Sequence, residues 1–269
     1  MKSFNGKNVL ITGGASGIGR LMALQLLDEG ANVVIWDIHQ ENMDRLQQAV
    51  KAKPGKLITV YCDVSRKGEI FSKASEFKAK MGDIHLLINN AGVVSGKSFM
   101  DCTEAQIEKT FSINAMALLW TTRAFLPDMI ENNEGHIVNI ASAAGLIGVA
   151  GLADYAASKF AAFGFDESIR VELKKRGSAV KTTIVCPYYI NTGMFRGVKS
   201  RFSWLLPILD ETKVARKIIR AVRKEKPRLL MPWTVYTVMP LRVFPVAVFD
   251  FVAGILGIHN SMDEFTGRT

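Results

Sequence analysis

Two residues four positions apart, Tyr155 and Lys159, have the types and spacing that best suit chemistry in this chain. Residues i and i+4 of a helix share one face, so both side chains can act on one small volume. A free tyrosine phenol titrates near pH ~10, and a neighbouring ammonium favours the phenolate and lowers the pKa. Ser142, thirteen residues before Tyr155, supplies a hydroxyl that can hold a substrate oxygen. Together the three residues predict proton transfer to or from an alcohol or a carbonyl.

Tyrosine–lysine spacing alone is also found where a packed aromatic ring lies beside a solvated lysine. The start of the chain provides independent support for the chemical interpretation. An apolar strand predicted over residues 8–12 runs into the turn Gly13-x-x-x-Gly17-x-Gly19, and helical spacing follows. Strand, glycine turn and helix in this order open a dinucleotide-binding βαβ unit. The glycines let the backbone approach a pyrophosphate, and the helix N-terminus offers unpaired N–H groups.

An acidic residue at the end of the next strand indicates which dinucleotide is bound. The strand predicted over residues 32–36 ends at Asp37, about twenty positions after the glycines, where a carboxylate accepts hydrogen bonds from a ribose 2′-hydroxyl and repels a 2′-phosphate. Positions 38 and 39 hold no Arg or Lys, and Ser16 precedes Gly17. The sequence therefore favours NAD over NADP, and favours this role for Asp37 over that of a strand-end turn residue.

These motifs resemble those of the short-chain dehydrogenase/reductase family over nearly the whole chain. The family's glycine motif is similar to residues 12–19, and its Asn-Asn-Ala-Gly signature is similar to residues 89–92. The resemblance implies that the cofactor-binding residues are Gly13, Ser16, Gly17, Ile18, Gly19, Asp37, Asp63, Val64, Asn90, Ala91, Gly92, Tyr155, Lys159, Pro187 and Thr192.

The resemblance also implies the catalytic residues, which are Asn114, Ser142, Tyr155 and Lys159. In the family's mechanism Lys159 would bind the nicotinamide ribose and lower the pKa of Tyr155. Ser142 would orient the substrate oxygen, and Asn114 would hold a water that links Lys159 to solvent. The cofactor carries the hydride, and the protein supplies position and protonation state.

One position near the site departs from the family pattern. Tyr188 follows Pro187, where the family often has glycine, and a bulky tyrosine changes the floor of the substrate site. The substrate-binding residues are expected to be Ser142, Tyr155, Tyr188 and Met194. Apolar character adds further candidates for the pocket wall, which are Met100, Leu146, Ile147, Phe195 and the loop 202–209.

Length and periodicity predict one α/β domain with a short extension. A chain of 269 residues buries a core of that size easily. Strands alternating with helices predict a single Rossmann-type, doubly wound parallel sheet with helices on both faces. The expected strands, about seven, lie at 8–12, 32–36, 57–62, 84–89, 135–140, 180–186 and 228–232, with helices at 17–29, 103–131 and 153–175 among the connections. We expect a dinucleotide-binding and catalytic domain over 1–232, and an apolar C-terminal extension over 233–269 that packs on the domain or on a membrane surface.

Other residue patterns restrict the function. The three cysteines and four histidines are scattered, so we expect no metal and no structural disulfide. Polar residues 2–8 lead directly into the first strand, which predicts a cytoplasmic protein without a signal peptide.

The C-terminal part of the chain is both basic and apolar. The net charge is +9, and residues 213–228 hold eight basic side chains against one acidic. Residues 229–258 are mostly apolar, but prolines, Arg242 and Asp250 interrupt them, so a spanning helix is not expected. The region 213–258 is interpreted as a peripheral membrane contact, as a lid over an apolar pocket, or as a solvated basic helix followed by a packed subdomain. Nucleic acid is not expected as a partner, because no recognised motif interleaves aromatic residues with these charges.

Three stretches near this end resemble the retinol dehydrogenase and hydroxysteroid dehydrogenase branch of the family. They are residues 201–210, 224–232 and 257–263. The resemblance implies a lipophilic alcohol as substrate, a place in lipid metabolism, and a homodimer or homotetramer built on the helices 103–131 and 153–175.

The sequence therefore predicts an NAD-dependent oxidoreductase that interconverts a hydrophobic alcohol and its carbonyl, the alcohol being a retinoid, a steroid or a long-chain aliphatic. Three alternatives stay open: a dehydrogenase for a small non-lipid alcohol, a non-catalytic dinucleotide-binding sensor, and a family member doing isomerase or epimerase work. The presence of both Tyr155 and Lys159 argues against the sensor.

Overall fold

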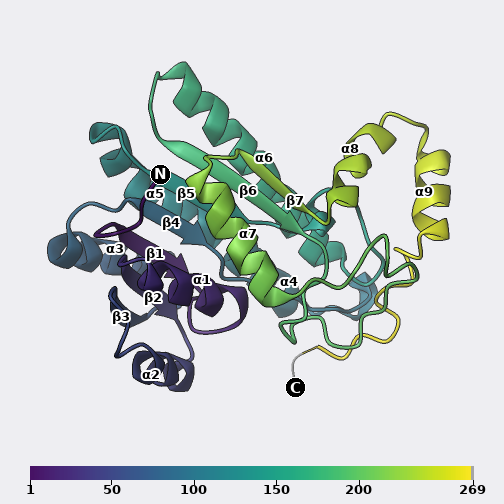
Figure 1. The fold of residues 1–269 in the computed structure, drawn as a ribbon. Coiled ribbons are helices and arrows are strands. Elements are labelled where there is room, and N and C mark those ends of the chain that lie inside the picture. Colours follow the sequence, from purple (N-terminus) through teal and green to yellow (C-terminus); the bar gives the residue numbers. More distant parts are fainter. Residues whose placement is uncertain (268–269) are drawn as a thin grey trace.

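The predicted parallel sheet is present in the computed structural model, which describes residues 1–267. Within these residues seven parallel strands form one sheet in the order β3-β2-β1-β4-β5-β6-β7 (Figure 1). The strands are β1 (Asn8–Thr12), β2 (Asn32–Asp37), β3 (Lys56–Tyr61), β4 (Leu86–Asn89), β5 (His136–Ile140), β6 (Lys181–Pro187) and β7 (Arg228–Met231). The strand order reverses between β1 and β4, and ligands of such sheets bind outside the carboxyl ends of the strands at that point.

Helices cover both faces of the sheet (Figure 1). They are α1 (Gly17–Asp28), α2 (Gln40–Ala49), α3 (Lys67–Met81), α4 (Glu104–Phe111), α5 (Ala117–Glu131), α6 (Ala153–Lys175) and α7 (Glu211–Arg223). Helices α1 and α7 pack together on one face, and α3 and α5 pack together on the other. The doubly wound architecture expected from alternating strands and helices is thus confirmed.

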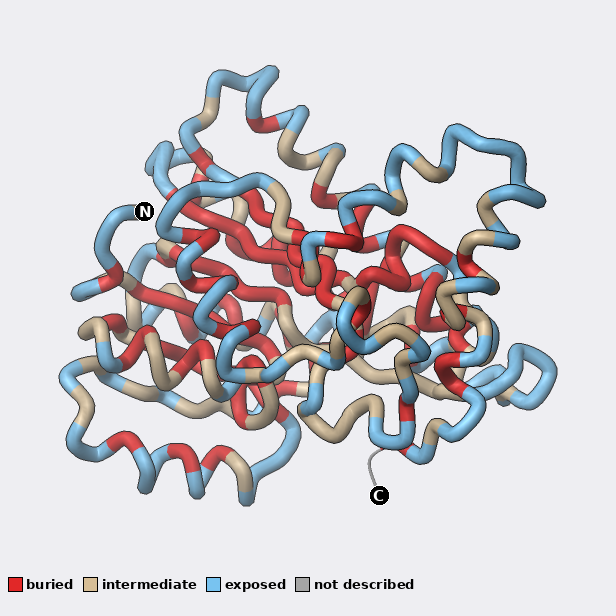
Figure 2. The backbone as a smooth tube through the Cα atoms, turned by 45° about the vertical axis from the view of Figure 1, so that its right-hand side comes forward, coloured by how far each residue is buried: buried red, intermediate tan, exposed pale blue. Residues whose placement is uncertain are grey.

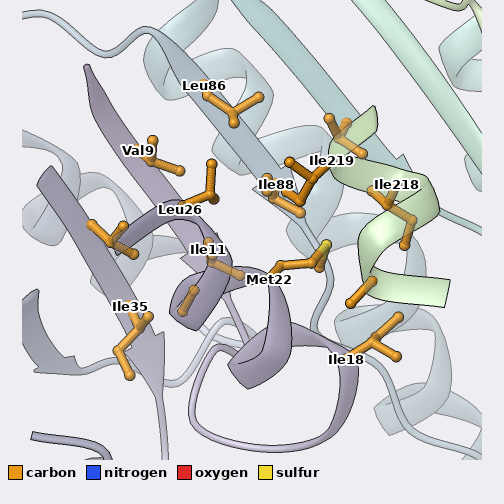
Figure 3. Close-up of a cluster of buried hydrophobic side chains, with 14 of the residues drawn as sticks. Val9, Ile11, Ile18, Met22, Leu26, Ile35, Leu86, Ile88, Ile218 and Ile219 are labelled. Carbon is orange, nitrogen blue, oxygen red and sulfur yellow. The ribbon is translucent and has the colours of Figure 1, made fainter. Parts of the chain in front are cut away.

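The central strands are apolar runs because helices cover both faces of the sheet and bury their side chains, whereas the edge strand β3 is partly exposed. All five residues of β1 are buried, and Figure 2 shows the central strands as the most deeply buried part of the chain. Between β1 and the helices, Met22 and Leu26 of α1 and Ile218 and Ile219 of α7 fill the core (Figure 3). This packing holds the glycine turn between β1 and α1 against the sheet.

The long helix expected over residues 103–131 is interrupted. Thr103 caps α4 through a capping box with Gln106. A π-helical turn, η2 (Ser112–Met116), then separates α4 from α5. Single π-helical turns inside α-helices occur mainly at functional sites, and this one carries Asn114. Helical apolar spacing does not reveal such a turn, because the turn spans only five residues.

After β7 the chain forms η4 (Trp233–Thr237), α8 (Val238–Leu241) and α9 (Val246–Ile255). These short helices stand beside the carboxyl ends of β6 and β7, and much of their backbone is exposed (Figures 1 and 2). Of the extension expected over 233–269, residues 268–269 lie outside the described residues, and the division at residue 232 stays a prediction. Across residues 1–267, no helix combines the length and apolar character needed to cross a bilayer.

Candidate active site

A cavity of about 200 Å³ lies at the carboxyl ends of the strands. It brings together nearly all residues expected at the cofactor, from segments far apart in the chain. The expected residues that line it are Gly13, Ser16, Gly17, Ile18, Asp37, Asp63, Val64, Asn90, Ala91, Gly92, Ser142, Tyr155, Lys159, Pro187, Tyr188, Thr192, Met194 and Phe195. Lining residues that sequence reasoning missed are Trp36, Ile38, His39, Cys62, Val93, Ile113, Ile140, Ala141 and Ile190. Most of these residues are next in sequence to an expected residue. The predicted ends of the strands could therefore have identified them.

The glycine turn forms a backbone cradle beside this cavity, packed too closely against its neighbours to admit side chains at Gly13 and Gly19. Gly13 and Gly17 have φ values of +62° and +51°, in the left-handed region that favours glycine. Gly19 does not line the cavity; a Cβ there would overlap the carbonyl oxygen of Gly13 and lie 2.6 Å from Nδ2 of Asn90. Asn90 Nδ2 in turn donates hydrogen bonds to the carbonyl oxygens of Thr12 (3.0 Å) and Gly13 (2.9 Å). The turn therefore leaves backbone-lined space at the N-terminus of α1, which fits a pyrophosphate.

Asp37 ties the end of β2 to the glycine turn. Its Oδ2 accepts a hydrogen bond from the Ala15 N–H (2.9 Å), and its Oδ1 accepts from the N–H groups of Ile38 (2.8 Å) and His39 (3.0 Å). Asp37 thus does act as a turn residue at the end of β2, the role that the sequence disfavoured. The carboxylate also lines the cavity, so one side chain serves both the turn and the site.

Tyr155, Lys159 and Ser142 converge at the inner end of this cavity. Tyr155 and Lys159 lie in the first two turns of α6 and are only 5% and 3% exposed. Lys159 Nζ donates a hydrogen bond to the Ile140 carbonyl oxygen (2.9 Å) and lies 5.6 Å from the Tyr155 ring centroid. Ser142 lies two residues after β5, and its hydroxyl accepts a hydrogen bond from the Ala144 N–H (3.2 Å). The same hydroxyl lies close enough to the Tyr155 phenol to lower the pKa of that phenol. The predicted trio is therefore assembled in one place.

Burial, rather than Lys159, controls the pKa of the Tyr155 phenol. Burial raises this pKa above its ordinary value because it disfavours the charged phenolate, and the nearby Ser142 hydroxyl lowers it only in part. Burial also lowers the pKa of Lys159 to about 8, because it disfavours the ammonium. Lys159 is not among the causes of this shift, and the expectation that it brings the pKa of Tyr155 down stays a prediction. The neutral phenol is the favoured form at neutral pH.

Asn114 fastens the loop after β4 to two helices. Its Oδ1 accepts a hydrogen bond from the Val93 N–H (2.8 Å), and its Nδ2 donates to the Val93 carbonyl oxygen (2.9 Å) and to Ser158 Oγ (3.1 Å). Asn114 Oδ1 and Lys159 Nζ converge on Gly92, since a Cβ there would lie 3.4 and 3.5 Å from them. Asn114 thus lies beside Lys159, and its expected role in holding a water stays a prediction.

A second cavity of about 320 Å³ adjoins the first and is almost entirely apolar. The two cavities share Ser142, Tyr155, Tyr188 and Phe195. The remaining wall includes Ile147 and Leu206 from the body of the protein and Leu256 directly after α9. Side chains of η4, α8 and α9 complete it, which are Trp233, Thr234, Val235, Thr237, Val238, Leu241, Phe249, Val252 and Ala253. Ser142 and Tyr155 therefore lie where the first cavity meets an apolar chamber.

Sequence reasoning identified the wall of this chamber only in part. Ile147, Tyr188, Phe195 and residues 205–206 of the expected loop line it, whereas Met194 lines the first cavity. Met100 lines neither and is 88% exposed, and Leu146 is buried in the core beside them. Most of the α8–α9 side of the wall was not assigned, because apolar character does not show which face of a helix meets a cavity.

This fold and site define a dinucleotide-binding oxidoreductase, and comparison with known proteins places it in a family. The short chain dehydrogenase family model matches residues 7–201. The chain is also 46% identical over 270 residues to epidermal retinol dehydrogenase 2 of Mus musculus, covering 99% of this chain and 87% of that protein. The chain therefore belongs to the short-chain dehydrogenase/reductase family.

Solved structures agree with this assignment. A short-chain dehydrogenase/reductase of Burkholderia phymatum in complex with NAD has a TM-score of 0.81 and 28% identity, and the match covers 90% of this chain and 95% of that one. A metagenomic short-chain oxidoreductase in complex with NADP has a TM-score of 0.71 and 27% identity, covering 84% and 96%. This protein is thus an oxidoreductase that acts on CH–OH groups with a nicotinamide dinucleotide, and the glycine cradle fits that cofactor. In the part of the chain that the structure describes, no three His, Cys, Asp or Glu side chains are grouped to hold a metal ion.

Proposed function

We propose that this protein interconverts a long lipophilic alcohol of the retinoid class and its aldehyde, with NAD as the preferred cofactor. The observation that carries the proposal is the apolar chamber of about 320 Å³ that opens onto Ser142 and Tyr155. The identity to a retinol dehydrogenase supports the retinoid class over the steroid and simple aliphatic alternatives. The chamber argues against a small polar alcohol, which would leave most of its wall unfilled.

The chain's own residues carry the proton chemistry in this proposal. When bound, the nicotinamide dinucleotide supplies the hydride acceptor or donor. Ser142 orients the substrate oxygen against the phenol, and Tyr155 accepts the hydroxyl proton in oxidation or donates it in reduction. Because burial keeps the phenol neutral, Tyr155 is set to donate a proton to a carbonyl. Lys159, with a pKa of about 8, can exchange protons close to neutral pH.

Catalytic efficiency should rise with the apolar length of the alcohol. Each buried methylene contributes about 0.8 kcal/mol, which corresponds to roughly fourfold in kcat/KM while the chamber still has room. The test is the initial rate of NADH formation with primary alcohols of increasing length and with retinol. If short polar alcohols have the highest kcat/KM, the substrate proposal is overturned and the small-alcohol alternative takes its place.

Filling the chamber should selectively harm long substrates. Ala253 lies on α9 and lines the chamber, so Ala253→Leu is expected to lower kcat/KM for retinol about tenfold or more and for ethanol by much less. Ala105→Leu makes the same change at an exposed position of α4 and serves as the control. An equal loss for retinol and ethanol would show that the variant acts through folding rather than through the chamber.

The preference for NAD rests on the carboxylate of Asp37 at the cavity wall. Asp37→Asn is expected to reduce the ratio of kcat/KM for NAD over NADP at least about tenfold, because the repulsion of a 2′-phosphate is lost. The asparagine amide has only one oxygen, which can accept only part of the three backbone hydrogen bonds that the Asp37 carboxylate accepts. The melting temperature is therefore measured together with the rates. Asp44→Asn, at an exposed position of α2, is the control. A native preference for NADP would contradict the proposal.

We also propose that η4, α8 and α9 contact a lipid bilayer. Their inner faces line the apolar chamber. Val246 and Phe251 of α9, and Val243 and Phe244 in the connection from α8, are 56–88% exposed. Trp233 of η4 lines the chamber and is also 73% exposed. A lipid surface is the partner that suits an exposed apolar face continuous with a chamber for a lipophilic substrate, and the net charge of +9 suits anionic lipids.

Co-flotation with phosphatidylcholine–phosphatidylserine vesicles tests the bilayer contact. The double variant Phe244→Asp/Phe251→Asp should lose most vesicle binding, whereas Tyr61→Asp, on exposed β3, should retain it. Native protein that does not float with the vesicles would favour the lid interpretation of the region 213–258. The homodimer or homotetramer expected through the helices of residues 103–131 and 153–175 stays a proposal, and sedimentation that shows only monomer would contradict it.

A further inference from the structure

The segment 258–267 packs against the loop that follows β6. The Thr266 N–H donates a hydrogen bond to the Arg196 carbonyl oxygen (2.9 Å), and the Lys199 N–H donates to the Ser261 carbonyl oxygen (3.2 Å). Ser261 Oγ also hydrogen-bonds with the Tyr189 hydroxyl (2.9 Å). The contact is close, because a Cβ at Gly197 would overlap the backbone of the segment. A stretch near one end of the chain is thus bound to a loop whose residues line the cofactor cavity.

An aromatic side chain carries this contact into the active site. The ring of Phe265 lies directly on Gly96, where a Cβ would overlap the ring. Its centroid is 6.3 Å from that of Phe195. Phe195 in turn meets Tyr155 edge to face, with centroids 5.7 Å apart and planes at 80°. Because Phe195 lines both cavities, it is the connection between segment 258–267 and the proton-transfer residue.

We propose that Phe265 is a positioning residue for Tyr155 and acts through Phe195. Held between Gly96 and Phe195, the Phe265 ring prevents Phe195 from moving away from Tyr155, and so keeps the phenol directed at the junction of the two cavities. The inference rests on the proposed function, in which Tyr155 transfers the proton. It extends that function to Phe265, which lines neither cavity.

The test compares Phe265→Ala with Phe265→Leu in the full chain. Phe265→Ala is expected to lower kcat about tenfold for the best alcohol found with the unsubstituted protein, because a small displacement of a catalytic group is costly. The Kd for NADH should stay within about threefold, since the dinucleotide is held mainly at the β1 turn and the end of β2. Phe265→Leu, which still fills the space, should recover most of kcat. Phe99→Ala, at an exposed phenylalanine that lines neither cavity, should leave kcat unchanged.

A double-mutant cycle with Phe195→Ala distinguishes positioning from general loosening. If Phe265 acts through Phe195, then Phe265→Ala should lower kcat by less than about twofold in the Phe195→Ala background. Independent, multiplying losses would overturn the inference, as would a Phe265→Ala variant with the native kcat.

A readout that does not need turnover separates this inference from the proposed function. Amide hydrogen exchange over residues 194–199 should become faster in Phe265→Ala, while exchange in the glycine turn stays the same. If the unsubstituted protein oxidises no alcohol, the proposed function fails, and the exchange measurement still tests whether Phe265 holds the loop. Unchanged exchange over residues 194–199 would overturn the inference whatever the activity.

Discussion

Replacing Tyr155 with phenylalanine is expected to lower kcat about a thousandfold and to leave dinucleotide binding nearly unchanged. The change removes only the phenolic oxygen of a residue that, like Ser142, lines both cavities. The ring and its edge-to-face contact with Phe195 remain, so the cavity walls should keep their shape. The loss should therefore appear in the chemical step and not in binding.

Steady-state oxidation of retinol and fluorescence titration with NADH check this expectation together. Tyr61→Phe makes the same change at an exposed tyrosine of β3 and should behave like the unsubstituted protein. A Tyr155→Phe variant with turnover within about tenfold of native would contradict the assignment of Tyr155 as the proton-transfer residue. Native protein that binds NADH and turns over no alcohol would instead favour the sensor alternative.

Replacing Lys159 with methionine should abolish most activity and stabilise the fold. Lys159 is only 3% exposed, and its ammonium donates a hydrogen bond to the Ile140 carbonyl oxygen. Burial lowers its pKa from 10.5 to about 8, which corresponds to about 3 kcal/mol of destabilisation at neutral pH. Methionine has a similar length and no charge. The lost hydrogen bond offsets part of the gain, so we expect a net increase of about 1–2 kcal/mol and a melting temperature higher by roughly 2–8 °C.

The pH dependence of stability gives a second check on Lys159. Between pH 8 and 10.5 the unfolded chain binds the Lys159 proton and the folded chain does not, so the free energy of unfolding of the native protein should rise with pH across that window. Below pH 8 both states carry the proton and Lys159 contributes no slope. The Lys159→Met variant should lack this rise.

Activity and stability should move in opposite directions in this variant. We expect kcat/KM to fall at least about a hundredfold, because the ammonium that lines the cofactor cavity is gone. Lys109→Met, at an exposed position of α4, should change neither quantity. A lower melting temperature for Lys159→Met would contradict the idea that this lysine is retained for function at a cost in stability.

Local patterns in the sequence determined the architecture and the identity of the chemical groups. Short apolar runs that alternate with helices, such as residues 9–11, are typical of buried parallel strands. The parallel sheet was therefore predictable strand by strand. The glycine turn was predictable because only glycine tolerates the positive φ of Gly13 and the close approach at Gly19. The tyrosine and lysine were recognisable because helical spacing is a short-range property.

Only the tertiary structure decided what those groups experience and what surrounds them. The burial that raises the Tyr155 pKa and lowers that of Lys159 depends on packing by distant segments. The apolar chamber forms where α9 faces Ile147. The Phe265 ring contacts Gly96, which lies far earlier in the chain. Burial, cavity shape and ring contacts are set by residues far apart in the chain. Local periodicity does not indicate which of these distant surfaces pack together.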